Sequence, residues 1–469
     1  MFIGRRNELA FLEEKYHAPG SQLVVLYGRR RVGKTETLRK FCEDKEHVFY
    51  SCTECTDEQQ LRAFSSRILA RDIPAARYIK AFSDWEQALD SISELPGRGR
   101  KLLIIDEFPY MARNNPSIPS ILQNLWDSRL KNENVMIILC GSAMSFIEKD
   151  VLAEKNPLYG RATGILKMNE MNFYEAIEFF PNYSHIDKIT AYAVLGGIPH
   201  YLRQFDPGKS LEENIKRNIL QRGSILYSEV EFLMRQELRE TTVYNTIIQA
   251  VALGNTKLND IFQKTQIDKN KLTVYLRNLI DLNLIRREFP VPDGIKEQAN
   301  VQRGLYQITD NFFRFWYAFV FPYISELEAG DEDGIYAYAI RPMLGQYTSR
   351  IYEDICREYL RRLNRQNALP FRFTNIGRWW NKSTELDIMA TDRDKNHFLL
   401  GECKFKNSAF DFSEMNAALR KFKPGKETAQ VYFIFFSKSG FTDDVQRSAG
   451  ECGFKLVPLD KIFNGSICR

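Results

Sequence analysis

The chain has 469 residues, of which 44% are hydrophobic and 27% are charged. These proportions are ordinary for folded globular protein, so they exclude fibrous and largely disordered classes. No apolar run reaches the length of a membrane span, and the chain is long enough for about three domains. The start of the sequence lacks a signal-peptide pattern and the eight cysteines are scattered, so we expect a cytoplasmic protein with no membrane partner.

The formal net charge is +5, and it is distributed unevenly. Residues 345–469 contain 21 Lys and Arg against 15 Asp and Glu, which gives +6, so the rest of the chain sums to −1. This basic excess indicates a polyanionic partner at the C-terminal end, with DNA as the candidate. Cys52 and Cys55 form a Cys-x-x-Cys pair, but no second pair of suitable spacing follows, so a coincidental pair is favoured over a metal or redox site.

Residues 23–35 contain the first functional pattern. An apolar strand over residues 23–27 passes directly into Gly28-x-x-x-x-Gly33-Lys34-Thr35, and a helical pattern continues over residues 36–42. In such a loop, backbone N–H groups surround phosphate oxygens, the lysine binds the β- and γ-phosphates, and the threonine hydroxyl contributes to a Mg²⁺ site. The predicted nucleotide-binding residues are Gly28, Arg29, Arg30, Arg31, Val32, Gly33, Lys34, Thr35 and Glu36.

A second pattern supplies the groups that hydrolysis requires. A hydrophobic strand over residues 101–105 ends in two carboxylates, Asp106 and Glu107. Asp106 is predicted to bind nucleotide-associated Mg²⁺, and Glu107 is predicted to be a catalytic residue that polarises the attacking water. The two patterns together predict an ATPase that uses ATP and Mg²⁺.

Strands and helices alternate through the N-terminal region. Residues 47–52 and 135–140 are predicted strands, and residues 57–95 are predicted to be helical. Such alternation predicts a parallel sheet covered by helices on both faces, with nucleotide at the carboxyl ends of the strands. Arg161 lies in a short turn that follows, where it could act catalytically on transition-state charge or form a structural salt bridge; the sequence favours neither.

The middle region is predicted to be helical and to contain a winged helix. Three helices over residues 243–253, 258–264 and 268–282 precede two short strands, at residues 284–289 and 305–308. The third helix is the one that would enter a DNA major groove. Acidic residues offset many of the basic residues of this domain, so DNA contact and a role as an internal arm both remain open. The aromatic run Phe312–Tyr317 is interpreted as core rather than as a base-stacking surface.

The C-terminal region contains a second set of candidate catalytic residues. A helix over residues 345–360 carries Glu353, and strands at 384–389 and 398–405 are predicted to form a hairpin. Glu402 and Lys404 are two residues apart and therefore share one face, and the hairpin brings Asp387 beside them. Asp387 and Glu402, with Glu353 as an additional ligand, are predicted to bind Mg²⁺, and Lys404 is predicted to orient or help deprotonate the attacking water.

Several motifs together resemble the archaeal-type P-loop ATPases of the STAND class, which are related to AAA+ proteins. They are GRRRVGKT, LLIIDE, the CGS strand end, PLYGR and the LGGIPHYL segment at residues 195–202. The resemblance implies that Ser142 senses the γ-phosphate and that the Gly-Arg segment at residues 2–9 packs on adenine. It also implies that Pro199, after Gly196 and Gly197, marks a coupling point, although a plain turn is the alternative. Asp387 with Glu402-Cys403-Lys404 resembles the D…ExK motif of the restriction-endonuclease-like fold.

The predicted fold class is α/β, with a P-loop NTPase parallel sheet, a helical and winged-helix middle region and a C-terminal α/β restriction-endonuclease-like domain. The predicted domains span residues 1–185, 186–325 and 340–469. The predicted function is an ATPase coupled to a Mg²⁺-dependent nuclease that acts on DNA. The alternative is a nucleotide-switched regulatory or scaffold protein that binds DNA or a protein partner without cleavage. A nucleotide-dependent homo-oligomer is an open expectation. The predicted metal ligands are Thr35, Asp106, Glu353, Asp387 and Glu402.

Overall fold

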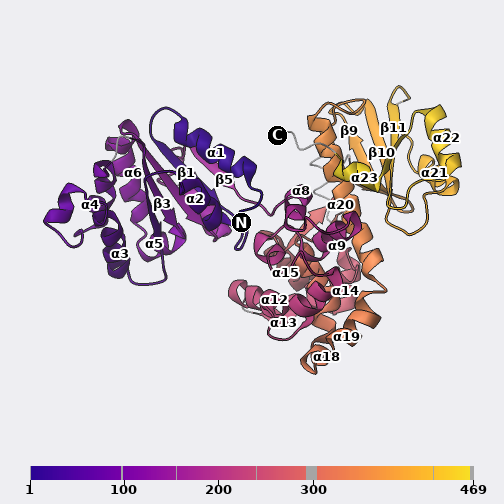
Figure 1. Cartoon of the computed structure of the whole chain (residues 1–469), viewed down its shortest axis with the longest axis horizontal. Helices are drawn as coiled ribbons and strands as arrows, with labels where there is room; N and C mark the ends of the chain where they lie inside the picture. The colour runs from indigo at the N-terminus through magenta and orange to yellow at the C-terminus, as the bar shows by residue number, and fades with distance from the viewer. Residues whose placement is uncertain are drawn as a thin grey trace. The chain divides into compact units, whose positions relative to one another are not determined.

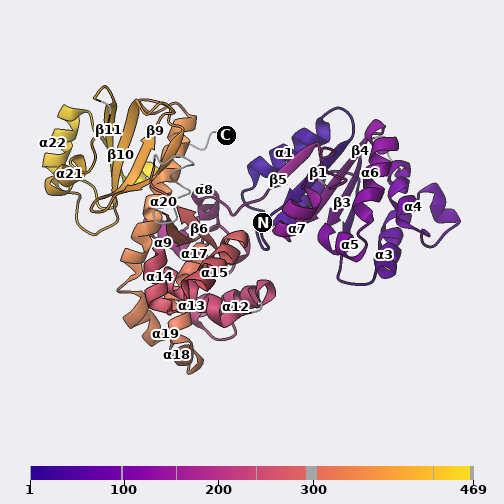
Figure 2. The ribbon, with the colours of Figure 1, turned by 180° about the vertical axis from the view of Figure 1, so that it is seen from behind.

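The computed structural model describes residues 2–96, 99–154, 156–238, 240–291, 304–425 and 427–464. The chain forms two compact units, which Figures 1 and 2 show from opposite sides. Unit 1 comprises Met1–Glu178 with Ile198–His200, and unit 2 comprises Phe179–Gly197 with Tyr201–Arg469. The division into three domains stays a prediction. None of the described helices is long and apolar enough to cross a membrane.

The N-terminal unit contains a five-stranded sheet in the order β2-β3-β4-β1-β5, and all of its strand pairs are parallel. The expected strands are confirmed, and a fifth strand, β5, adds an edge that the sequence did not predict. With four residues and alternating half-buried side chains, β5 lacks the continuous apolar run that identifies a central strand. The strands are β1 Gln22–Tyr27, β2 His47–Ser51, β3 Lys101–Asp106, β4 Val135–Gly141 and β5 Gly164–Lys167.

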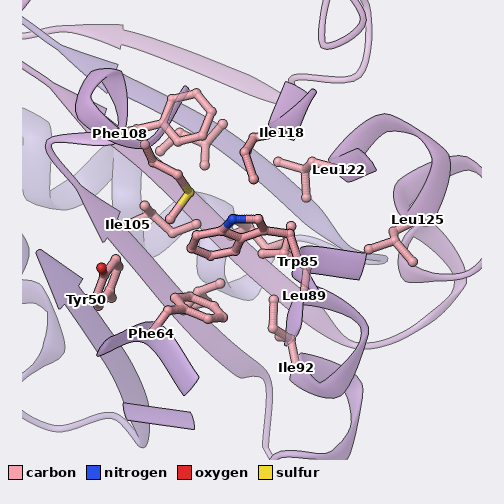
Figure 3. Close-up of a cluster of buried hydrophobic side chains, with 14 of the residues drawn as sticks. Tyr50, Phe64, Trp85, Leu89, Ile92, Ile105, Phe108, Ile118, Leu122 and Leu125 are labelled. Carbon is pink, nitrogen blue, oxygen red and sulfur yellow. The ribbon is translucent and has the colours of Figure 1, made fainter. Parts of the chain in front are cut away.

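Helices cover both faces of this sheet, because successive side chains of a strand point to opposite sides. On one face, α3 to α6 pack around Phe64 and Trp85, which lie against Tyr50 and Ile105 of the sheet (Figure 3). Helices α1 and α2 pack against each other. The helices of this unit are α1 Arg6–His17, α2 Lys34–Cys42, α3 Asp57–Leu69, α4 Trp85–Asp90, α5 Phe108–Asn114, α6 Ile118–Ser128, α7 Met144–Phe146 and α8 Phe173–Ala176.

The middle region is helical, and the predicted three helices and two strands occur in the predicted order. The strands β6 and β7 pair antiparallel, and most of the loop predicted between them, with Asp293 and Glu297, lies outside the described residues. The elements are α9 His185–Leu195, α10 Pro199–Leu202, α11 Leu211–Ile215, α12 Ile225–Glu237, α13 Thr241–Ala252, α14 Leu258–Thr265, α15 Lys269–Asp281, β6 Ile285–Glu288, β7 Leu305–Ile308, α17 Asn311–Phe319, α18 Ile324–Glu328 and α19 Glu332–Ile335.

The aromatic run predicted to be core is buried in α17. The indole N–H of Trp316 donates to the carbonyl oxygen of Tyr227 at 2.8 Å, and the Tyr317 hydroxyl donates to Asn245 Oδ1 at 2.7 Å. Both polar ends are therefore satisfied inside the protein, as large buried aromatic side chains require. The interpretation as core is confirmed, and these rings are not available to stack on bases.

The C-terminal region is a mixed five-stranded sheet in the order β12-β11-β10-β9-β8. The predicted hairpin is confirmed, because β9 and β10 pair antiparallel. Phe435 packs with α21 and α22, whereas Phe436 contacts Tyr359 of α20, so the helices cover opposite faces (Figures 1 and 2). The elements are α20 Leu344–Arg365, β8 Asn375–Trp380, β9 Glu385–Thr391, β10 His397–Lys404, α21 Phe412–Leu419, β11 Gln430–Ser437, α22 Asp443–Cys452, β12 Lys455–Pro458 and α23 Leu459–Phe463.

The core of the N-terminal unit predicts a stability effect. Phe64 is completely buried between Tyr50 and Trp85, so Phe64→Ala should destabilise this unit by about 3–5 kcal/mol through lost burial and a residual cavity. The measurement is the urea concentration at which the chain loses nucleotide binding. Tyr78→Ala is the matched control, because Tyr78 is 85% exposed. Equal midpoints for the two variants would contradict this packing.

Candidate functional sites

The phosphate loop follows β1 and has the backbone that its glycines allow. A side chain at Gly28 would collide with the carbonyl oxygen of Met168, so only glycine fits at the end of this strand. Gly33 has a φ of +91°, a value that glycine adopts without steric cost. The predicted loop therefore ends directly at the first turn of α2, where N–H groups are available to an anion.

Lys34 is held inside this loop. Its ammonium group donates to the carbonyl oxygen of Gly28 at 2.8 Å and to that of Arg29 at 3.0 Å. The residue is only 6% exposed, and burial lowers the pKa of the Lys34 ammonium. The positive charge is thus positioned by two carbonyl groups within the loop where phosphate oxygens are expected.

The strand order brings the other predicted ATPase residues together. The Thr35 hydroxyl donates to Asp106 Oδ2 at 2.7 Å, and the Ser142 hydroxyl donates to both oxygens of Glu107, at 3.0 and 2.9 Å. Glu107 has a φ of +53°, which turns the chain sharply after β3. Because β4 lies between β3 and β1, Ser142 at its end reaches Glu107, and its role as a γ-phosphate sensor stays a prediction.

Arg5 and Arg161, two arginines that the sequence singled out, have partners in this unit. Arg5 is 2% exposed and donates to the carbonyl oxygen of Val32 at 2.6 Å, so the N-terminal Gly-Arg segment contacts the phosphate loop. Arg161 forms an ion pair with Asp127 of α6 at 2.9 Å. The structural alternative for Arg161 is therefore present, and a catalytic role stays a prediction.

The Gly-Gly-Ile-Pro segment joins the two units. Gly196 has a φ of +66°, and Ile198–His200 belong to unit 1 although the residues on either side belong to unit 2. A side chain at Gly33 would lie 3.7 Å from Pro199 Cγ. Pro199 therefore lies beside Gly33 within unit 1, and both the coupling point and the plain turn stay predictions for this segment.

In the C-terminal site, Asp387 is held by the backbone of the neighbouring strand. The amide N–H of Cys403 donates to Asp387 Oδ2 at 2.9 Å, and Arg357 NH1 of α20 donates to the Asp387 carbonyl oxygen at 2.6 Å. These two bonds fix the side chain and the main chain of Asp387 beside Glu402 and Lys404, so the predicted grouping of these three residues is present.

Glu402 is buried and accepts hydrogen bonds from two lysines. Lys404 Nζ donates to Oε2 at 3.3 Å and Lys421 Nζ donates to Oε1 at 2.5 Å. Burial and the neighbouring Asp387 raise the pKa of the Glu402 carboxyl, and the lysines oppose this shift. The predicted face shared by Glu402 and Lys404 is confirmed, and Lys421 is a further member of the site.

Glu353 lies at the same site from the side of α20. Its Oε2 atom lies 3.8 Å from both Arg357 NH1 and Arg378 Nε and has no hydrogen-bond partner. Burial and the nearby Asp387 raise the pKa of Glu353 to about 7. Carboxylates from α20, β9 and β10 therefore repel one another at this site, although no group of three or more His, Cys, Asp or Glu among the described residues encloses a metal position.

The antiparallel β6–β7 pair is connected to this site. Arg378 of β8 donates to Glu288 of β6 at 3.3 Å and also forms an ion pair with Glu385 of β9. The backbone N–H of Val291 donates to the carbonyl oxygen of Arg378 at 2.9 Å. The end of β6 thus contacts the C-terminal sheet, which favours an internal arm over a free DNA-reading wing.

Sequence reasoning missed two residues of the C-terminal site. Arg357 follows Glu353 by four residues on one helix, a spacing that places them on one face and could have identified the pair. Lys421 comes after the end of α21, and only the folded arrangement brings it to Glu402. No spacing rule connects positions 402 and 421.

Comparison with known proteins agrees with the N-terminal site. Residues 2–205 match an ATPase domain found predominantly in archaea, and residues 316–418 match a family described as archaeal and bacterial proteins of unknown function. An uncharacterized protein of Methanocaldococcus jannaschii is 35% identical over 409 residues, which are 87% of this chain and 88% of that protein. An uncharacterized ATP-binding protein of the same organism is 52% identical over 46 residues, 10% of this chain and 78% of that protein.

A solved Walker-type ATPase of Pyrococcus abyssi aligns with a TM-score of 0.48 and 22% identity, covering 67% of this chain and 96% of that one. The phosphate loop and the family match identify residues 2–205 as a P-loop ATPase domain, which implies ATP binding and hydrolysis. The chain belongs to the same family as the Methanocaldococcus jannaschii protein that is 35% identical to it. The ATPase part of the sequence prediction is confirmed, and the nuclease part stays a prediction.

The position of Lys34 predicts its contribution to nucleotide binding. Lys34→Ala should weaken ATP binding by roughly tenfold to a hundredfold, because a hydrogen bond to a charged group contributes about 1.5–3 kcal/mol. Isothermal titration of the full chain with ATP and Mg²⁺ measures this. Lys40→Ala is the control, since Lys40 lies on the same helix with an exposed side chain that pairs with Glu43. Equal ATP affinity for wild type and Lys34→Ala would disprove the assignment of the loop.

Glu353 predicts a pH dependence of stability. With a folded pKa of about 7, the folded chain binds more protons at this group than the unfolded chain between about pH 4.5 and 7. Stability is therefore full below this window and is lost as the pH rises through it. Glu353→Gln cannot titrate and so does not lose stability over this window. The free energy of unfolding of the variant minus that of wild type should therefore be about 2–3 kcal/mol more positive at pH 8 than at pH 5.

Thermal unfolding in EDTA at the two pH values tests this, with the exposed Glu326→Gln as the control. If Glu353→Gln is instead more destabilising at pH 8 than at pH 5, the ion pairs of Glu353 with Arg357 and Arg378 in wild type outweigh the effect of burial on its pKa.

Proposed function

We propose that this protein is an ATP-controlled, Mg²⁺-dependent nuclease that acts on DNA. The observation that carries the proposal is the cluster in which Asp387 accepts a hydrogen bond from the Cys403 amide, directly beside Glu402 and Lys404. Two carboxylates and a lysine on adjoining strands provide the groups needed for phosphodiester hydrolysis. The basic excess of residues 345–469 supports a polyanionic substrate.

The donor atoms of this cluster are carboxylate oxygens, the kind that a hard divalent cation prefers. Asp387 and Glu402 supply carboxylate oxygens, and Oε2 of Glu353, which has no hydrogen bond and lies 3.8 Å from two arginine nitrogens, would be a further donor. Burial, and after it repulsion from Asp387, raises the pKa of both Glu353 and Glu402, and bound positive charge would favour their ionised forms. When bound there, Mg²⁺ would polarise the scissile phosphate and lower the pKa of the attacking water.

The protein's own groups then have separate tasks. Lys404 is 32% exposed and orients the attacking water, whereas Lys421 neutralises the buried Glu402 from the other side. Arg357 fixes the main chain at Asp387, so it is a positioning residue. Water attacks phosphorus, one P–O ester bond breaks, and the leaving oxygen takes a proton.

The ATPase site also contains hard oxygen donors suited to Mg²⁺. The Thr35 hydroxyl and the Asp106 carboxylate, already 2.7 Å apart, would hold the Mg²⁺ that accompanies ATP. Glu107 orients the attacking water, and Ser142 exchanges its bond to Glu107 for the γ-phosphate when ATP is bound. Arg161 supplies charge to the transition state only if it leaves Asp127, for example across a subunit boundary of a nucleotide-dependent homo-oligomer.

Coupling between the two sites runs through the middle region in this proposal. Pro199 lies beside Gly33 of the phosphate loop, and Glu288 at the end of β6 pairs with Arg378 next to Glu353. A change in the loop on nucleotide binding would be transmitted to the Gly-Gly-Ile-Pro segment and then to β6. Nucleotide state would in this way set access to Asp387.

One observation favours a second function, in which the protein is a nucleotide-switched regulator or scaffold that binds DNA or a protein partner without cleavage. Both oxygens of Glu402 already accept hydrogen bonds from lysines, and the described residues form no enclosed group of three metal-binding side chains. A site saturated by its own lysines could retain a nuclease-like fold for binding alone. Divalent-ion dependence distinguishes the two functions.

The nuclease proposal predicts cleavage that depends on Asp387. Single-stranded, duplex and branched DNAs are incubated with the full chain and Mg²⁺ or Mn²⁺, with and without ATP. Asp387→Asn should reduce cleavage at least about 100-fold, because it removes a charged ligand while preserving shape. Asp443→Asn, an exposed acid at the start of α22, is the control.

Glu107→Gln tests the coupling, since it should retain ATP binding while slowing hydrolysis and changing the ATP dependence of cleavage. Absence of cleavage on every DNA by a preparation that hydrolyses ATP would favour the scaffold.

A further inference from the structure

The chain between α3 and α4 of unit 1 forms a surface segment that is held at both ends. Ile73 is 1% exposed and Phe82 is 7% exposed, and the backbone N–H of Phe82 donates to the Ser65 hydroxyl oxygen at 3.1 Å. A short 3₁₀ helix, Pro74–Arg77, directly follows Ile73. Residues 77–80 lie between the two buried side chains and are all exposed. The fold therefore sets the position of these residues while their side chains stay accessible.

This segment carries an aromatic ring that the fold does not use. Tyr78 is 85% exposed, and the neighbouring Ile79 is 36% exposed. The Tyr78 ring makes no ring contact and no side-chain hydrogen bond within the described part of the chain. Phe64 and Trp85, which flank the segment in the sequence, are in contrast both packed in the core of the unit. The Tyr78 ring thus contributes little to folding and is available to a ligand.

Positive charge is concentrated around this ring in the sequence. Four exposed cations lie within residues 67–80, namely Arg67, Arg71, Arg77 and Lys80. None of these four side chains has an ion pair or a hydrogen bond among the described residues. Residues 67–80 contain these four cations against one Asp, which gives +3, whereas residues 57–66 and 81–95 contain one Arg against six Asp and Glu, which gives −5. Asp84, the first acid after the segment, caps α4 by accepting the Gln87 N–H at 2.9 Å.

The segment and the phosphate loop lie toward opposite edges of the sheet. Helix α3 follows the carboxyl end of β2, and β3 runs parallel to β2, so the chain between them returns to the amino edge. The end of α3 and the residues after it therefore lie toward the amino edge, whereas the phosphate loop follows the carboxyl end of β1. A ligand with phosphates at this segment does not compete for the nucleotide site.

We propose that the basic segment, residues 67–80, binds single-stranded nucleic acid. Its four cations bind backbone phosphates, and an unpaired base stacks on the exposed ring of Tyr78. The ring selects a single strand, because the bases of a duplex are already paired and stacked on one another. An acidic peptide would match the charge, but it brings no row of flat bases to the ring. Binding should be independent of base sequence, since every base has a flat π-face.

The test uses the full chain with Asp387→Asn in EDTA, so that no strand is cleaved. A short oligothymidylate that contains 4-thiothymidine is cross-linked by near-ultraviolet light, and mass spectrometry locates the attached residue. A cross-link at Tyr78 is expected, and its yield against oligonucleotide concentration measures the affinity of this surface alone. Tyr338 is the internal control: it is 56% exposed, but the charges of Glu326 and Asp331 act on it, so it should stay free of cross-links.

Arg77→Met and Lys80→Met keep the ring and each remove one positive charge. Each should weaken the affinity measured at Tyr78 roughly twofold to fivefold, as the loss of one exposed charge contact does. Each should also lower the slope of log affinity against log salt by about 0.7, because one phosphate contact is lost. Arg62→Met is the matched control: it removes the same charge from α3, but Arg62 pairs with Glu58 at 2.7 Å, so both quantities should stay close to those of the parent.

The proposal is overturned if no cross-link forms at Tyr78, if a duplex with the same label is cross-linked there equally well, or if Arg77→Met and Lys80→Met leave the affinity unchanged. Displacement of the strand by polyglutamate as readily as by unlabelled oligothymidylate would also overturn it, in favour of an acidic polypeptide partner. Displacement by oligouridylate supports it and would identify RNA as a further source of the strand. None of these outcomes depends on whether the C-terminal region cleaves DNA.

Discussion

The order of strands in the N-terminal sheet is the constraint on which the ATPase site depends. Parallel strands end at one edge, and the adjacency of β1, β4 and β3 brings their three following segments together there. Lys34, Ser142 and Asp106 are separated by more than 30 residues from one another in sequence and nevertheless share that edge. Burial of the Lys34 ammonium against two carbonyl oxygens then holds positive charge at a place where only an anion can neutralise it.

The C-terminal region contains a cluster of negative charges, in contrast to the buried positive charge of Lys34. Glu353, Asp387 and Glu402 come from three different elements, and their mutual proximity is unfavourable without compensation. Lysines compensate Glu402, whereas arginines lie at longer distances from Glu353. Arginines and lysines thus offset part of the repulsion among these carboxylates, and the proposed Mg²⁺ would offset more of it.

The sequence was informative wherever local pattern and chemistry coincide. The strands ending at Gly28 and Asp106 are continuous apolar runs followed by charged or glycine-rich turns, and the hairpin of Asp387 and Glu402 follows from period-two spacing. Prediction failed for β5, whose side chains are only alternately half-buried, and for β8, an edge strand that carries Arg378 and an irregular register. It also failed for Lys421, because its approach to Glu402 depends on how α21 packs rather than on any spacing in the chain.

The middle region contacts the C-terminal carboxylate cluster through Arg378. Arg378 interacts with acids from three elements: Glu288 of β6, Glu353 of α20 and Glu385 of β9. If β6 moved away, Arg378 would keep only Glu353 and Glu385, and its position relative to the carboxylate cluster would change. β6 supplies one of the three carboxylates that pair with Arg378, so its position affects the charge beside the cluster. For this reason β6, rather than α15, is the part of the middle region that the proposed coupling would use.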